Sequence, residues 1–206
     1  MLATLVLALS LAHTPCAQRI DVVSPSPRST TAALTLTECG RPAGGPWTAR
    51  VGYAGVSAHH HEGDGTTPLG TFAIGPVLYG LDPNPGVSLR YHRLVCGDWW
   101  DEDPASPTYN TFRHVPCGQT PPFGGASEAL WRSPRAYREL AFVEYNTRPV
   151  IPGRGSAIFL HDDKGDATTG CISLPRPELL RLLRWLRPGA TISIRLAARL
   201  HGTAVA

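Results

Sequence analysis

The chain has 206 residues and a net charge of +3, and charged residues make up only 17% of it. Its 21 glycines and 20 prolines favour a turn-rich, strand-heavy protein over a helical bundle. The length favours one domain, and no Lys/Arg tract forms the patch that nucleic-acid binders carry, so we expect no nucleic-acid partner.

The first segment, MLATLVLALSLAHTPCAQ, contains an apolar run that is too short to span a bilayer. We expect residues 1–17 to be a signal peptide, with the alternative of a buried first strand or helix. The mature protein would then be secreted or kept in the cell envelope, with no stable membrane span. Residues 18–30 are rich in Ser, Pro and Thr, and we expect a spacer that buries little apolar surface.

Cysteine usage fits an oxidising compartment. Cys16 would leave with the leader, and Cys96 and Cys117 bracket an irregular, aromatic-rich segment. We predict a disulfide between Cys96 and Cys117, because closing a loop of this size would stabilise the fold by about 3 kcal/mol. Cys39 and Cys171 then remain, either as a second disulfide or as two thiols with separate roles.

The predicted folded domain covers residues 31–197 and is followed by a tail, 198–206. Alternating apolar and polar residues predict strands over 32–39, 47–55, 70–74, 141–146, 156–161 and 190–196. We expect the fourth and fifth of these strands to pair. Residues 80–127 are dense in Pro, Gly and aromatic residues and are expected to be mostly loop, which the predicted disulfide would hold.

Two helices are predicted. A short one begins at Ser133, with Pro134 at its first helical position. A longer one begins at Pro177 and ends at Pro188 and Gly189. Its apolar face consists of Leu179, Leu182, Leu183 and Leu186.

The segment SAIFLHDDKGDATTGCISLP carries the strongest chemical pattern. His161 ends an apolar strand, and Cys171 follows ten residues later behind a small-residue turn. A cysteine attacks carbonyl carbon only as a thiolate, so it needs a nearby base, and His161 can supply one. Gly170 would allow backbone N–H groups to approach a developing oxyanion.

These residues resemble the catalytic motif of the L,D-transpeptidase (YkuD) family: a strand-ending His161, then Thr168-Thr169-Gly170-Cys171-Ile172-Ser173-Leu174. The upstream segment DGTTPLGTFAIG resembles the TPxGxF segment of that family. The likeness covers roughly residues 31–196 and is closest to an actinobacterial secreted branch with TxGCVSLP at this place. The resemblance implies a mostly β, mixed α+β fold, an L,D-transpeptidase-like β-sandwich with a few short helices.

The resemblance also implies an activity. Cys171 would attack a diaminopimelate carbonyl in a peptidoglycan stem tetrapeptide, expel D-alanine and form a thioester. A diaminopimelate amine of a neighbouring stem would accept the acyl group, giving a 3-3 cross-link. His161 would act as base and then as acid, oriented by Asp162, Asp163 or a backbone carbonyl. No cofactor is needed, and we expect a monomer.

Two positions differ from the family pattern. Thr169 replaces a histidine and Ser173 replaces an arginine, and the loop from His161 to Cys171 is shorter than in most members. Substrate preference and rate would depend on these positions, so Thr169 and Ser173 are candidate substrate-binding residues. Asn146, at the end of the strand expected beside His161, is a third candidate.

Three other functions compete with the transpeptidase hypothesis. The first is an L,D-carboxypeptidase or another hydrolase on the same scaffold. The second is a non-catalytic relative that binds the cell envelope, in which Cys171 is buried or paired with Cys39. The third is a metal-dependent peptidase using His59, His60 and His61, but adjacent strand residues alternate sides, so we expect a polar loop and no metal site.

Further polar and aromatic groups have simpler explanations. The DDKGD segment lacks the spacing of a calcium loop, so a solvated turn is expected. Four arginines at helical spacing are expected to form the wet face of the second helix, although they could contact an anionic polymer: Arg176, Arg181, Arg184 and Arg187. Four aromatic residues could form a substrate wall or fill the core under the loop: Trp99, Trp100, Tyr109 and Phe112.

Overall fold

A computed structural model describes residues 16–125 and 127–198 of the protein. The proposed signal peptide therefore lies outside the described residues except for its last two positions. The proposed tail likewise lies outside them beyond residue 198. Within the described ranges, no helix is long and apolar enough to cross a membrane.

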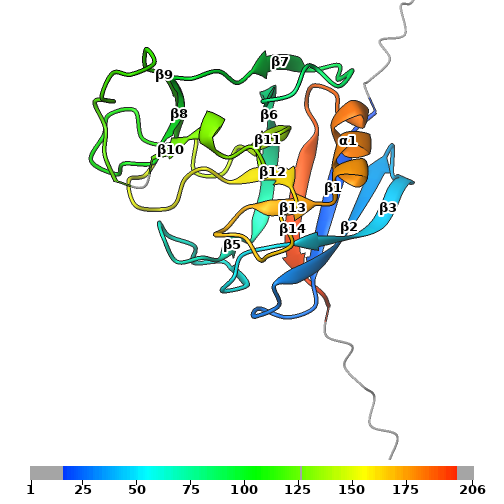
Figure 1. Ribbon diagram of the computed structural model, residues 1–206. Coiled ribbons are helices and arrows are strands. Elements are labelled where there is room, and N and C mark those ends of the chain that lie inside the picture. The colour runs from blue at the N-terminus through cyan, green and yellow to red at the C-terminus, as the bar shows by residue number, and fades with distance from the viewer. Residues whose placement is uncertain (1–15, 126, 199–206) are drawn as a thin grey trace, which may run out of the picture.

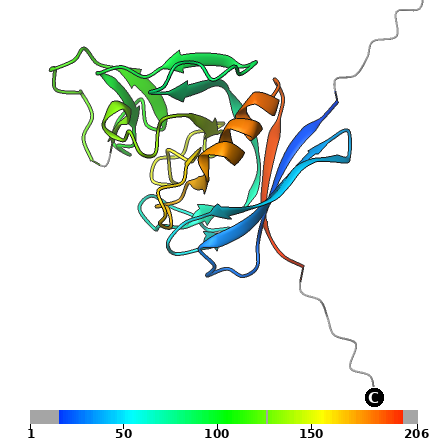
Figure 2. The same ribbon diagram turned by 45° about the vertical axis from the view of Figure 1, so that its right-hand side comes forward.

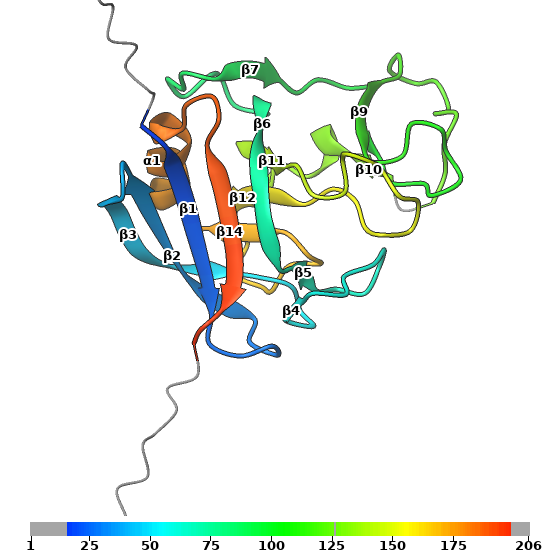
Figure 3. The same ribbon diagram turned by 180° about the vertical axis from the view of Figure 1, so that it is seen from behind.

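Nine strands of the described chain form one large sheet (Figure 1). In spatial order they are β11 (Leu140–Val143), β12 (Phe159–Asp162), β13 (Ile172–Leu174), β3 (Arg41–Arg50), β2 (Thr31–Glu38), β1 (Gln18–Ser24), β14 (Thr191–Leu196), β6 (Gly70–Gly80) and β7 (Arg90–Arg93). Figure 3 shows β1, β14 and β6 side by side on the back of the molecule. Two further strands, β4 (Val56–Ser57) and β5 (Thr67–Pro68), form a small parallel pair.

The large sheet closes on itself, because β11 pairs with both β12 and β6. The predicted pairing of the strands around 141–146 and 156–161 is thus confirmed as the antiparallel β11–β12 ladder. The pairing with β6 covers the edge that β11 would otherwise expose. The buried apolar side chains form two clusters, and Ile20, Leu34, Leu160 and Ile172 are fully buried in the larger one. The prediction of a mostly β fold is confirmed.

The N-terminal part of the fold corrects the predicted spacer at 18–30. Residues 18–24 form β1, which pairs in parallel with β14 and antiparallel with β2. Ile20 and Val22 are fully buried. The Ser and Pro residues that suggested a spacer begin only at Ser24, the last residue of β1, and continue into the turn before β2, so averaging composition over the segment hid the strand.

The cysteine pairing was predicted only in part. The disulfide between Cys96 and Cys117 is present, as predicted. Cys39, however, is bonded to Cys16, not to Cys171. Cys16 precedes β1 and Cys39 follows β2, so this disulfide joins the start of β1 to the end of β2. A cut after Ala17 would remove Cys16 and therefore one half of the disulfide.

One α-helix, α1 (Arg176–Trp185), packs on the core beside β12 and β13, and Figure 2 shows it lying across the sheet. It begins one residue before the predicted Pro177. The four leucines of its predicted apolar face are fully buried: Leu179, Leu182, Leu183 and Leu186. The helix predicted from Ser133 is absent: Ala136 and Tyr137 only form a single turn by donating to Ser133 O. A short 3-10 helix, η1 (Leu130–Arg132), precedes it.

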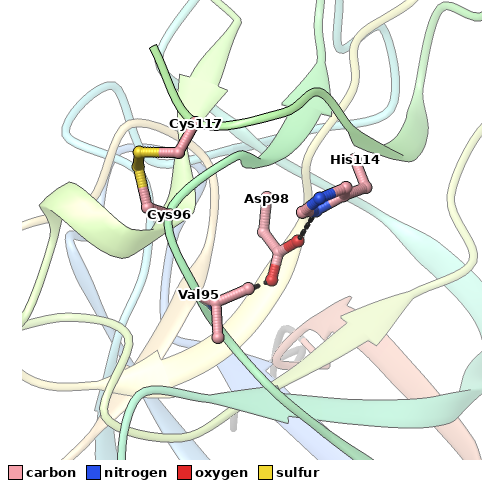
Figure 4. Close-up of a disulfide and its surroundings, with 5 residues drawn as sticks. All are labelled: Val95, Cys96, Asp98, His114 and Cys117. Carbon is pink, nitrogen blue, oxygen red and sulfur yellow. Dashed lines mark hydrogen bonds and ion pairs between the residues drawn. A yellow bond between two sulfur atoms is a disulfide. The ribbon is translucent and has the colours of Figure 1, made fainter.

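Residues 80–127 are more regular than predicted. β8 (Asp98–Asp101) pairs with β9 (Thr111–His114) and with β10 (Glu128–Ala129), forming a three-stranded sheet at the side of the molecule away from β2 and β3 (Figures 1 and 3). The Cys96–Cys117 disulfide joins the segments that lead into β8 and out of β9 (Figure 4). Next to it, the buried carboxylate of Asp98 accepts hydrogen bonds from His114 Nδ1 and Val95 N.

Candidate active site

Cys171 lies immediately before β13 and is the one cysteine among the described residues that is not in a disulfide. Its side chain is buried, and Sγ lies 3.2 Å from the carbonyl oxygen of Ala157. A carbonyl can only accept, so the sulfur carries the proton in this contact. The backbone N–H of Phe159 donates to Sγ at 3.4 Å. The alternative of a Cys39–Cys171 disulfide is therefore excluded.

The upstream TTPLG segment fixes the backbone of Cys171. Two hydroxyls donate to the carbonyl oxygen of Cys171, from Thr168 at 2.6 Å and from Thr67 at 3.3 Å. Thr67 Oγ1 in turn accepts from the N–H of Gly52. The two motifs of the sequence are thus one structural unit, in which the first holds the turn that presents the cysteine.

His161 lies on β12, which runs parallel to β13, with His161 opposite Ser173. Its Nδ1 lies 2.8 Å from the backbone oxygen of Asp162. Because that oxygen can only accept, Nδ1 carries the hydrogen and Nε2 keeps a free lone pair. Of the three orienting groups considered from the sequence, the backbone carbonyl is the one that makes this contact.

His161 and Cys171 line the same cavity, of about 110 Å³, together with Tyr137 and Ser173. The described residues include no direct hydrogen bond between the imidazole and the thiol. Burial lowers the pKa of His161 to about 4, so the imidazole is neutral at pH 7. Burial, reinforced by the nearby charge of Glu128, raises the pKa of the Cys171 thiol well above its usual range. The resting pair is therefore a neutral thiol and a neutral base.

Gly170 is required at its position. Its φ of +144° is reserved for glycine, and an added Cβ would lie 3.0 Å from Thr66 O. The Gly170 N–H donates to Thr168 Oγ1 at 3.2 Å. This amide is therefore already used, and an oxyanion contact from it would require that bond to break. Thr169 is exposed and lines the cavities around Cys171, whereas Ser173 is buried and lines only the one that contains His161.

Asn146 is not placed for substrate binding, which corrects the prediction. Its side-chain amide donates to Ile151 O and Gly155 O, and its Oδ1 accepts from Ile151 N. All three contacts close a surface loop, and Asn146 lines a groove that does not include Cys171. The residue lies just beyond β11 with φ of +51°, where a short amide side chain bonds to the local backbone.

A second cavity, of about 240 Å³, also contains Cys171 and was not predicted. It is lined by His60 and by three glutamates from distant segments: Glu62, Glu102 and Glu128. His60 is buried, with Nδ1 2.9 Å from Asp64 Oδ1, so it supplies a second imidazole near Gly170 from outside the catalytic motif. Burial lowers its pKa despite the raising effect of Asp64. Apart from the segment that contains Cys171, the histidine run is the part of this lining that the sequence analysis singled out.

Most of the other groups follow the simpler explanation. Trp100 and Tyr109 are buried, as expected of core residues under the loop. Asp163 accepts from Arg50 in the solvated turn after His161. Two arginines of α1 make long-range contacts: Arg181 lies over the ring of Trp47, and Arg176 pairs with Asp82 and with the buried Glu139, so Arg176 is not part of a wet helix face. Among the residues in the described ranges, no group of three or more His, Cys, Asp or Glu side chains could hold a metal ion.

Residues 23–194 match the family described as YkuD, the L,D-transpeptidase catalytic domain. Two solved structures are similar in fold: an L,D-transpeptidase from Mycobacterium smegmatis, with 12% identity and a TM-score of 0.41, and Mycobacterium tuberculosis L,D-transpeptidase 1, with 13% identity and a TM-score of 0.38.

The alignments cover 89% and 87% of this chain but only 59% and 62% of those two chains. The chain thus corresponds to less than two thirds of either protein. No curated protein matches it. The family match extends over most of the described residues and includes both Cys171 and the TTPLG segment that positions it. The chain therefore belongs to the L,D-transpeptidase catalytic domain family.

Proposed function

We propose that the protein is an exported cysteine acyltransferase that forms 3-3 cross-links between peptidoglycan stem peptides. The donor would be a tetrapeptide stem, and the acceptor would be a diaminopimelate amine of a neighbouring stem. The single observation that carries this proposal is the free Cys171 thiol, held in a cavity that it shares with the neutral base His161.

In the first half-reaction, the sulfur attacks the diaminopimelate carbonyl carbon while His161 Nε2 takes the thiol proton. The carbon–sulfur bond forms, the bond to the D-alanine nitrogen breaks, and the imidazolium returns its proton to that nitrogen. Because the thiol and the imidazole are both neutral at rest, the proton moves from the sulfur to the imidazole while the sulfur attacks the carbonyl carbon. The attack is not made by a preformed thiolate–imidazolium pair.

In the second half-reaction, the acceptor amine attacks the thioester carbonyl. The carbon–nitrogen bond forms, the carbon–sulfur bond breaks, and the sulfur regains a proton. Water in place of the amine would give a tripeptide, which is the outcome of the carboxypeptidase alternative. Export is supported by the two disulfides, which persist in oxidising compartments.

The thioester is tested by intact-mass measurement after incubation with a carbapenem, which acylates nucleophiles of this type. We expect one covalent adduct on the wild-type protein and none on Cys171→Ala. His161→Gln keeps a hydrogen-bonding side chain but removes the base, so adduct formation should slow at least a hundredfold. Arg195→Gln, at an exposed position of β14, serves as the control for loss of a positive charge away from the cavity.

A wild-type protein that gains no adduct would contradict the acyltransferase and favour the non-catalytic, envelope-binding alternative. The acceptor is tested separately, with a disaccharide tetrapeptide as the only substrate. Formation of a cross-linked dimer supports transfer, and formation of a tripeptide alone supports hydrolysis.

A further inference from the structure

The larger cavity beside Cys171 is unusually acidic. Glu62 reaches it from the loop between β4 and β5, Glu102 directly follows β8, and Glu128 lies in β10. The antiparallel pairing of β8 with β10 brings the last two together. No lysine or arginine of the described chain lines this cavity. It shares only Glu128, Thr169 and Cys171 with the cavity that contains His161.

The carboxylates are held in place but are not all satisfied. Glu62 Oε2 accepts hydrogen bonds from Tyr109 and Ser156, and Glu128 Oε2 accepts one from Tyr137. Glu102 is 9% exposed, and its Oε1 is buried without a hydrogen-bond partner among the residues that the structure describes. A buried carboxyl oxygen left unpaired is costly, and a bound hydrogen-bond donor would remove that cost.

The chemistry of the site selects an organic cation. Three carboxyl groups from three segments call for a positively charged donor, yet the described residues contain no cluster arranged to hold a metal ion. A primary ammonium group has three N–H donors that diverge and can reach three separate acceptors. A guanidinium is planar and suits one carboxylate in bidentate geometry, so it fits this arrangement less well.

We propose that Glu62, Glu102 and Glu128 bind a primary ammonium group in the cavity next to Cys171. This assignment rests on the proposed function: the ammonium is that of the acyl acceptor. The cavity of about 240 Å³ is large enough for a short aliphatic amine, and Cys171 lies in its wall. Acceptor and thioester would then meet at the sulfur, with the donor on the side of His161.

Such a site also supplies the proton acceptor that transfer needs. The ammonium gives its proton to a glutamate carboxylate, and the free amine attacks the thioester. Sulfur then leaves and takes the proton that the nitrogen loses. Burial, together with Glu128 and Glu62, raises the pKa of Glu102 to about 9 in the empty cavity, so this carboxyl is protonated there at pH 7, and the positive charge of a bound ammonium would favour its carboxylate form. A carboxylate with an ordinary pKa would be a far weaker base towards this cation.

Binding is tested without chemistry, in the Cys171→Ala protein, by NMR titration with two probes. Nα-acetyl-lysine amide carries the ammonium, and Nα-acetyl-norleucine amide has the same chain length without it. We expect shifts from the lysine probe only, and at least tenfold weaker binding after Glu102→Gln. Glu62→Gln is the second variant, should Glu102→Gln fail to fold. Glu144→Gln, which lies outside the cavity, is the matched control.

Equal binding of both probes, unchanged affinity in both glutamine variants, or tighter binding of calcium or of Nα-acetyl-arginine amide would overturn the proposal. The result is separate from the carbapenem adduct. An adduct on the wild type without binding of the lysine probe removes the ammonium site and leaves the acyltransferase. Binding without an adduct leaves the ammonium site and removes its role as acceptor site.

Discussion

The state of the Cys171 proton follows from the atoms around its sulfur. Sγ donates to Ala157 O, and the side chain is buried beside Glu128. Both burial and a nearby negative charge disfavour a thiolate, and the N–H of Phe159 and the charge of Lys164 oppose them only in part. The folded protein therefore holds a thiol that ionises at higher pH than an exposed cysteine.

This state predicts a particular pH dependence for alkylation of Cys171 by iodoacetamide. The raised pKa keeps the thiolate a small fraction at neutral pH, so the rate should rise about tenfold per pH unit from pH 7 to 9.5 without a plateau. The protein unfolded in urea with its disulfides intact is the reference, and it should level off near pH 8.5. Intact-mass measurement follows the reaction. A plateau below pH 8 in the folded protein would contradict this description of the site.

At the scale of elements, one asparagine connects the three-stranded sheet to the cysteine. Asn110 precedes β9, and its Oδ1 accepts from Trp100 Nε1 and Ala157 N. Its amide also donates to the carbonyl oxygens of Tyr145 and Asn146. These bonds hold Ala157 at φ of +51°, a conformation that residues other than glycine rarely adopt, and so aim its carbonyl at Cys171.

We expect Asn110→Ala to lower the free energy of unfolding by about 3 kcal/mol, because it leaves the buried Trp100 Nε1 and Ala157 N unpaired. Ala157 should then leave its positive φ, and the adduct with carbapenem should form at least tenfold more slowly. Asn146→Ala is the matched control, since it also removes a bonded loop amide but leaves the Asn110 to Ala157 bond intact. Urea titration and timed mass spectra give the two readouts. Equal slowing by both variants would refute a specific role for Asn110.

The elements also show how far sequence reasoning reaches. Cys171 and His161 could be predicted because they lie only ten residues apart, His161 on β12 and Cys171 directly before the neighbouring parallel strand β13. β2 and β14 were found because alternation marks half-buried strands. β1 was missed because composition was averaged across the strand and the Ser/Pro turn that follows it.

The acidic cavity was missed for a different reason. Glu62, Glu102 and Glu128 are far apart in sequence, and they meet only because β8, β10 and the loop before β5 converge on Cys171. Asn146 was misassigned because its position beyond β11 was judged from strand pairing alone. Its hydrogen bonds are made to the following loop, which no periodicity describes.

At the scale of the whole molecule, two disulfides close separate stretches of the chain. Cys16–Cys39 ties the start of β1 to β2, and Cys96–Cys117 ties the ends of the β8–β9 hairpin. The sequence separations are 23 and 21, so each disulfide should contribute about 3 kcal/mol by restricting the unfolded chain. Because the two loops do not overlap, the effects should add to about 6 kcal/mol.

A domain of this kind has a total stability of about 5 to 15 kcal/mol, so loss of both disulfides should remove a large part of it. We expect reduction to lower Tm by roughly 12 to 24 °C, measured by circular dichroism with and without a phosphine reductant. Cys96→Ser with Cys117→Ser should account for about half of the drop, and Cys16→Ser with Cys39→Ser for the rest.

Cys171→Ala should respond to reduction like the wild type, because its sulfur takes part in neither bond. Thiol titration of the unfolded, unreduced protein that keeps Cys16 should count one free cysteine. A drop below 5 °C, or a second free thiol, would show that the pairing around β1 does not stabilise the fold in this way.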